Sequence, residues 1–148
     1  GRIGLIGHSL GGYNAYFLAA FDDRIRATVV SCGFTPLAGG SRPFGWARET
    51  WFVHFPKLAR YLRAGIAPFD FHEVMALVAP RGLFVYAAAQ DSIFPDTDSI
   101  RAAAAQVEGV YHVLGAGREF RFRMDDGPHH FPQAARQEAY RFLEQRLR

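Results

Sequence analysis

Ser9 lies in the middle of a glycine-rich run that constrains the fold more than any other stretch of the sequence. Residues 7–12 read Gly-His-Ser-Leu-Gly-Gly. The apolar residues 3–7 predict a buried strand, and the breaker-free residues 13–21 predict a helix. Ser9 is thus expected at a strand-to-helix turn in the G-x-S-x-G pattern of a nucleophile elbow, where glycines permit a close backbone approach. The alternative is a capping serine in an ordinary glycine-rich turn.

Composition narrows the class of protein. The chain has 148 residues, 49% hydrophobic and 21% charged, which fits one globular domain over residues 1–148. No apolar run reaches the roughly 18 residues of a membrane span, so no membrane association is predicted. The net charge is +3 and the basic residues form no stripe, so no nucleic-acid partner is predicted either. The lone Cys32 excludes an internal disulfide and is expected to be a buried, inert thiol.

Apolar runs of strand length alternate with helical patterns along the chain. This alternation predicts an α/β fold with a mostly parallel sheet flanked by helices. The last strand alternates charged and apolar residues, which is typical of an edge strand with one solvent-exposed face. The predicted strands are 3–7, 27–31, 82–88 and 119–124, and the predicted helices are 13–21, 74–78 behind a capping box at Asp70, 96–107 and 132–147.

Residues 33–69 interrupt this alternation. The segment is rich in Gly, Pro and aromatic residues. We expect it to form an insertion of short helices over the carboxyl end of the sheet. Most of its aromatic side chains are expected to be core. The candidates for substrate contact are Trp46, Trp51 and Phe52, together with His8 of the elbow.

A carboxylate and an imidazole are also expected near Ser9. A serine hydroxyl needs a base to take its proton, and the base needs a carboxylate to fix its tautomer. Asp91 follows the third predicted strand, and His129 and His130 follow the fourth. The carboxyl ends of parallel strands meet at one edge of a sheet, so these groups are expected to converge on Ser9. No metal-ligand spacing or phosphate loop is evident, and no cofactor is predicted.

The sequence resembles the α/β-hydrolase superfamily over essentially all of its length. Residues 7–12 resemble its elbow. Residues 79–85, Ala-Pro-Arg-Gly-Leu-Phe-Val, resemble the segment before the acid strand in dienelactone-hydrolase-like, acetyl-xylan-esterase-like and prolyl-oligopeptidase-like members. Residues 129–132, His-His-Phe-Pro, resemble their H-x-F-P segment. The resemblance implies that Ser9 is the nucleophile, Asp91 the acid and His129 the base, with the backbone N–H of Leu10 as an oxyanion donor.

The chain differs from the family at its N-terminal end. The family's sheet has further strands before the elbow strand, and a loop among them supplies the second oxyanion donor. Neither is present here, so the chain corresponds to the C-terminal half of the fold. The resemblance therefore implies a partner in the form of the missing N-terminal half.

These observations predict a serine hydrolase that cleaves a small-molecule carboxylic ester through an acyl-enzyme. One alternative is a prolyl-oligopeptidase-like peptidase on the same triad, and another is a non-catalytic half-domain that only pairs with its missing half. Asp96 and Asp98 are expected to cap a helix, although each remains a fallback for the acid. The remaining histidines are expected to be structural or surface residues: His54, His72 and His112.

Overall fold

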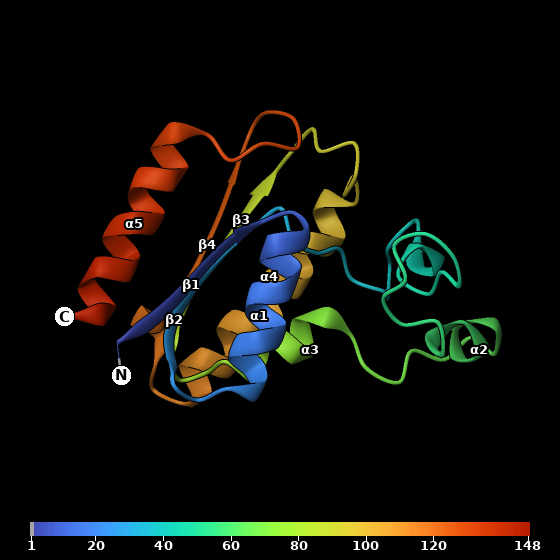
Figure 1. Ribbon diagram of the computed structural model, residues 1–148, viewed down its shortest axis with the longest axis horizontal. Helices are drawn as coiled ribbons and strands as arrows, with labels where there is room; N and C mark the ends of the chain where they lie inside the picture. Colours follow the sequence, from blue (N-terminus) through green and yellow to red (C-terminus); the bar gives the residue numbers. More distant parts are fainter. Residues whose placement is uncertain (1) are drawn as a thin grey trace.

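The computed structural model describes residues 2–148 and contains one four-stranded sheet (Figure 1). The strands are β1 (Ile3–His8), β2 (Ile25–Ser31), β3 (Gly82–Ala88) and β4 (Phe120–Asp125), in the order β1-β2-β3-β4. All three strand pairs are parallel, which confirms the predicted α/β class. The helices are α1 (Leu10–Phe21), α2 (Leu58–Arg63), α3 (Phe71–Ala76), α4 (Thr97–Val113) and α5 (Gln133–Leu147), with 3-10 turns η1 (Pro43–Gly45) and η2 (Gly117–Glu119).

Helices cover both faces of the sheet because the inner strands are apolar on both sides. Successive strand residues point to opposite faces. Val30 and Val85 therefore join the core under α1, α3 and α4, whereas Val29 and Phe84 join the core under α5. Figure 1 shows α5 on one side of the sheet and α1 and α4 on the other. None of the helices in residues 2–148 combines the length and the apolar character needed to cross a membrane.

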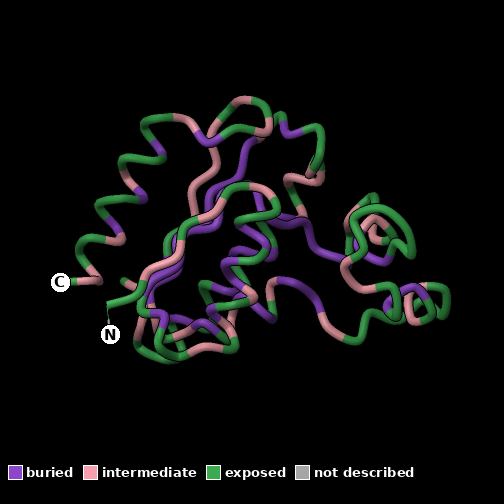
Figure 2. The backbone as a smooth tube through the Cα atoms, viewed as in Figure 1, coloured by how far each residue is buried: buried purple, intermediate pink, exposed green. Residues whose placement is uncertain are grey.

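The two edges of the described sheet differ in character. Figure 2 shows β2 and β3 almost continuously buried, whereas β1 alternates between exposed and intermediate residues. Ile3 and Ile6 of β1 are 43% and 44% exposed, so an apolar edge strand faces outward. The strand β4 forms the opposite edge and carries charged side chains, as its alternating sequence predicted.

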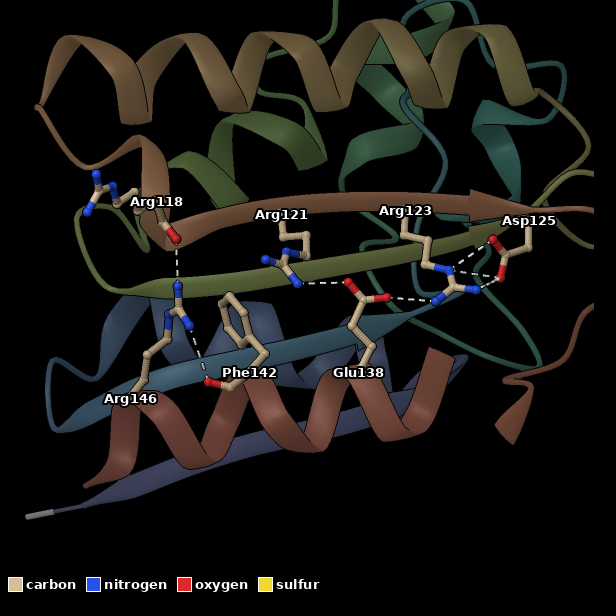
Figure 3. A network of polar contacts seen from close by, with 7 residues as sticks. All are labelled: Arg118, Arg121, Arg123, Asp125, Glu138, Phe142 and Arg146. Atoms are coloured by element: carbon tan, nitrogen blue, oxygen red, sulfur yellow. Dashed lines mark hydrogen bonds and ion pairs between the residues drawn. The ribbon is translucent and has the colours of Figure 1, made fainter. Parts of the chain in front are cut away.

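A network of ion pairs joins β4 to α5 (Figure 3). Glu138 of α5 accepts hydrogen bonds from Arg121 at 2.8 Å and from Arg123 at 2.6 Å. Partial burial raises the pKa of Glu138, but the bonds from Arg123 and Arg121 outweigh it and leave that pKa below its ordinary value. Arg123 also pairs with Asp125 at the end of β4. The network thus ties together β4 and α5, the two elements that flank the loop over residues 126–132.

Two aspartates attach the segment 33–69 to the rest of the chain. Asp70 forms the predicted capping box with Glu73, and its carboxylate also accepts the backbone N–H groups of Leu37 and Ala38, each at 2.9 Å. Asp96 stands at the N-cap position of α4, but its side chain does not cap the helix as predicted. Its carboxylate instead accepts the backbone N–H and hydroxyl of Ser41, at 2.8 and 3.0 Å, because the loop after β2 lies closer than the helix amides.

Several helix ends differ from the sequence prediction: α1 already begins at Leu10, and α3 spans Phe71–Ala76 rather than 74–78. The helix α4 continues beyond Val107 to Val113, so His112 lies in its last turn. The helix α5 begins at Gln133, and Pro132 is its N-cap residue rather than its first helical residue. Phe131 is accordingly drawn inward, where its ring packs on Tyr86.

The turn between β1 and α1 requires a glycine at position 7 but not at position 11. A Cβ on Gly7 would lie 2.1 Å from the carbonyl carbon and oxygen of Gly11 and 2.6 Å from the nitrogen of Gly12. A Cβ on Gly11 would meet nothing within 4 Å. The turn therefore has no room for a side chain at position 7, whereas a side chain at position 11 would meet no steric clash.

This asymmetry predicts opposite effects of two alanine substitutions. Gly7→Ala should lower the free energy of unfolding by at least about 3 kcal/mol, because backbone cannot rotate away from the added methyl group. Gly11→Ala should be neutral or stabilising by up to about 1 kcal/mol, since alanine is the better helix former. Denaturant unfolding of the two variants beside the wild type measures both. Equal stability of the two variants would contradict the steric account.

Candidate functional site

Ser9 occupies the strained backbone conformation expected of an elbow. Its φ is 55° and its ψ is −121°, a region that residues with a side chain rarely adopt. The backbone N–H of Ser9 donates to the carbonyl of Ser31 at 2.8 Å, which holds the turn on the end of β2. Leu10 is the first residue of α1, so its own N–H has no acceptor within the helix. Ser9 and Leu10 both line the same cavity.

Asp91 and His129 meet at the carboxyl end of the sheet. The Nδ1 atom of His129 lies 2.6 Å from Oδ2 of Asp91. The other carboxylate oxygen of Asp91 accepts the backbone N–H groups of Ile93 at 2.8 Å and Phe94 at 3.1 Å. The Asp91 side chain is only 2% exposed and that of His129 is 16% exposed. A buried carboxylate held by two backbone N–H groups can in turn hold the imidazole ring in one orientation.

The second ring nitrogen of His129 is free. Nε2 is buried and has no hydrogen-bond partner among residues 2–148, and no hydrogen bond joins it to Ser9. The ring lies 4.8 Å from that of His8, the chain neighbour of Ser9, and 5.7 Å from that of Phe94, which lines the cavity with Ser9. An unpaired buried nitrogen costs free energy. A neutral imidazole nitrogen without a partner can accept a proton, so Nε2 is a candidate base; His129 itself lies next to Phe94 and is not one of the residues that line the cavity.

The alternative candidates for the acid and the base do not join the contact between Asp91 and His129. The carboxylate of Asp96 is engaged with Ser41, and Asp98 is exposed in the first turn of α4. His130 is exposed, and its only hydrogen bond within the described chain runs to its backbone carbonyl, from Sγ of Cys32 at 3.7 Å. Of the candidates for acid and base, Asp91 and His129 are the two that the structure brings together.

A cavity of about 380 Å³ opens beside Ser9. The predicted aromatic residues Trp46, Trp51 and Phe52 line it, although Trp46 is 8% exposed and also belongs to the core. Sequence reasoning missed several lining residues, because only the folded loop shows which side chains turn inward. They include Arg42, Arg48, His54, Thr35 and Tyr13.

His8 does not line this cavity. It ends β1 with its side chain on the α5 side of the sheet, where its ring stacks on Phe131 and its Nδ1 lies 3.0 Å from the hydroxyl of Ser31. Burial, and then the neighbouring charge of His129, lower the pKa of His8 below its ordinary value. The alternation of the strand explains the difference from the prediction, since residues 8 and 9 face different ways. Ser31 itself is fully buried.

Cys32 adds an unexpected neighbour to the pair. Potential ligand atoms of Cys32, Asp91 and His129 all lie within 4.8 Å of one another, a cluster that sequence spacing could not show because three separate loops supply it. Burial, followed by the nearby Asp91 carboxylate, raises the pKa of the Cys32 thiol to about 12. Only the thiolate binds metals strongly, so this cluster is a poor metal site. The cluster is therefore a buried carboxylate–imidazole pair next to a neutral thiol.

No family model matches the chain. Two relatives are "Putative hydrolase YtaP" of Bacillus subtilis (strain 168), 29% identical over 146 residues, and "Carbohydrate esterase MZ0003" of an unknown prokaryotic organism, 28% identical over 123 residues. The matches cover 99% and 78% of this chain but only 46% and 28% of the relatives. The chain thus spans less than half of their length.

Solved structures match nearly the whole of this chain but, like these relatives, less than half of their own length. The glucuronoyl esterase of Solibacter usitatus superposes with a TM-score of 0.81 at 24% identity, and the glucuronoyl esterase catalytic domain of Hypocrea jecorina with 0.79 at 23% identity. Each match covers 98% of this chain, but only 42% and 44% of the respective structures. The chain therefore has the α/β-hydrolase fold and corresponds to the C-terminal half of that fold.

Proposed function

We propose that the protein carrying this chain is a serine hydrolase that cleaves carboxylic esters, with Ser9 as nucleophile, His129 as base and Asp91 as acid. The observation that carries the proposal is the arrangement of His129: its Nδ1 is bound to the buried Asp91 at 2.6 Å, and its Nε2 is left unpaired. A general base of this kind needs one ring nitrogen held by a carboxylate and the other free to take a proton. The strained turn of Ser9 supplies a hydroxyl at the wall of the adjoining cavity.

The proposed reaction has two steps. Ser9 Oγ attacks the ester carbonyl while His129 Nε2 takes the hydroxyl proton, and the alcohol leaves with that proton. Water then attacks the acyl-enzyme with His129 again as base, which releases the acid. The N–H of Leu10, at the positive end of α1, is proposed to stabilise the oxyanion in both steps. The names of the relatives support an ester, and specifically an ester of a carbohydrate, rather than the peptide bond of the alternative.

We further propose that residues 1–148 form one domain and that residues 33–69 are an insertion over the site. Support comes from the cavity, which that segment walls with Trp46, Trp51 and Phe52. The exposed apolar edge of β1, and relatives more than twice as long as the match, support a partner in the form of a preceding half of the same fold. That half is proposed to supply a second oxyanion donor, which is worth roughly a hundred- to thousandfold in rate.

The assignment of the acid predicts different effects of two aspartate substitutions. Asp91→Asn should lower kcat for a nitrophenyl ester on the order of 10⁴-fold, because the amide reverses the tautomer of His129. Asp98→Asn should change kcat by less than about twofold, since this side chain lies exposed at a helix start. Asp96→Asn serves as a third variant, because it removes the contact with Ser41 and leaves Asp91 untouched. A 10⁴-fold loss at Asp96 with an active Asp91→Asn variant would overturn the assignment.

The assignment of the base is tested by the two adjacent histidines. His129→Ala should abolish the burst of nitrophenol that reports acylation, because no other group accepts the Ser9 proton. His130→Ala should keep most of the burst, since the contribution of His130 in the structure is a backbone carbonyl that alanine retains. Stopped-flow burst amplitudes of both variants give the comparison. The reverse pattern would require a triad redrawn around His130.

A further inference from the structure

Two arginines stand at the wall of the cavity that contains Ser9. Arg42 and Arg48 come from the segment between β2 and α2, on either side of η1. The other lining residues are apolar or aromatic, or carry a neutral hydroxyl or imidazole, and within the described chain no aspartate or glutamate lines this cavity. The charge of the cavity wall is therefore entirely positive.

Neither arginine is neutralised by the chain. Among residues 2–148, no carboxylate lies within 4.0 Å of the guanidinium group of Arg42 or Arg48. By contrast, the arginines along β4 and α5 are held in ion pairs (Figure 3). The nearby Asp96 directs its Oδ2 to Ser41 and Thr35 instead.

The charge of Arg48 acts inside the cavity. Its guanidinium lies 5.4 Å from the centre of the Trp51 ring, so it rests over an aromatic side chain of the same wall. Burial, followed by the charge of Arg48, lowers the pKa of His54, another lining residue. Arg42 and Arg48 are both exposed, so an anion that enters the cavity from solvent would meet their positive field beside largely apolar walls.

We propose that this site selects esters that carry a carboxylate group, which Arg42 and Arg48 bind while Ser9 attacks the ester carbonyl. The inference rests on the proposed esterase function and adds the charge of its substrate. Arginine suits this role because its planar guanidinium pairs with a carboxylate through two parallel hydrogen bonds. A neutral ester leaves both cations without a partner and binds through the aromatic walls alone. The carboxylate can belong to the acyl part or to the alcohol part of the ester.

The test compares isosteric esters that differ only in charge. One pair places the group on the acyl part: the 4-nitrophenyl monoester of glutaric acid and its terminal carboxamide. The other places it on the alcohol part: 4-acetoxybenzoate and 4-acetoxybenzamide. The measured quantity is the ratio of kcat/KM for the anion to that for the amide. In the wild-type protein at least one pair should give a ratio of about tenfold or more, as expected for a charge-assisted contact. Raising the ionic strength should reduce this ratio.

Variants show whether the two arginines cause the preference. In an Arg42→Gln/Arg48→Gln double variant the ratio should fall to about one, and because it compares two esters on one protein, partial misfolding cancels. Arg141→Gln, an exposed arginine of α5 outside the cavity, is the control that should retain the wild-type ratio. A wild-type ratio near one for both pairs, or an unchanged ratio in the double variant, would overturn the proposal.

Failure of the inference and failure of the proposed function are distinguishable. Ser9→Ala should abolish hydrolysis of all four esters if the esterase function is right. If Ser9→Ala is inactive while the wild type ignores charge, the esterase remains and the carboxylate preference is wrong. If Ser9→Ala hydrolyses the esters as fast as the wild type, the function itself fails, and the preference fails with it.

Discussion

The contact between the bare Cα of Gly7 and the backbone of Gly11 is the constraint on which the site depends. A side chain at position 7 would meet carbonyl atoms at 2.1 Å, so only glycine lets β1 reverse directly into α1. That reversal forces Ser9 into its positive φ and leaves its hydroxyl at the cavity wall. The parallel pairing of the strands then brings the ends of β3 and β4 to the same edge of the sheet, where Asp91 and His129 meet.

Much of this was predictable because it follows from local chemistry. Strand boundaries came from apolar runs, the start of α3 from the capping box at Asp70, and the candidates Asp91 and His129 from their positions after predicted strands. Contacts that depend on tertiary packing were not predictable in this way. Asp96 reaches across to Ser41 instead of capping its own helix, and His8 turns toward the α5 side of the sheet.

Several loop side chains near the site escaped prediction, unlike the aromatic Trp46, Trp51 and Phe52. The spacing of Arg42 and Arg48 carries no periodicity, and only the folded path of residues 33–69 shows that both face the cavity. The approach of Cys32 to Asp91 and His129 likewise joins three loops that are remote in sequence. Sequence patterns report neighbours along a helix or strand. They do not report which loop residues converge at the end of a sheet.

The central claim is that Ser9 is an activated nucleophile, and covalent labelling tests it most directly. A fluorophosphonate should modify the protein once, on the tryptic peptide over residues 3–24, in which Ser9 is the only serine. Mass spectrometry separates this peptide from that over residues 27–48, which contains Ser31 beside His8. An adduct on Ser9 that is lost in His129→Ala is the predicted result. No adduct, or an adduct on Ser31, would contradict the account.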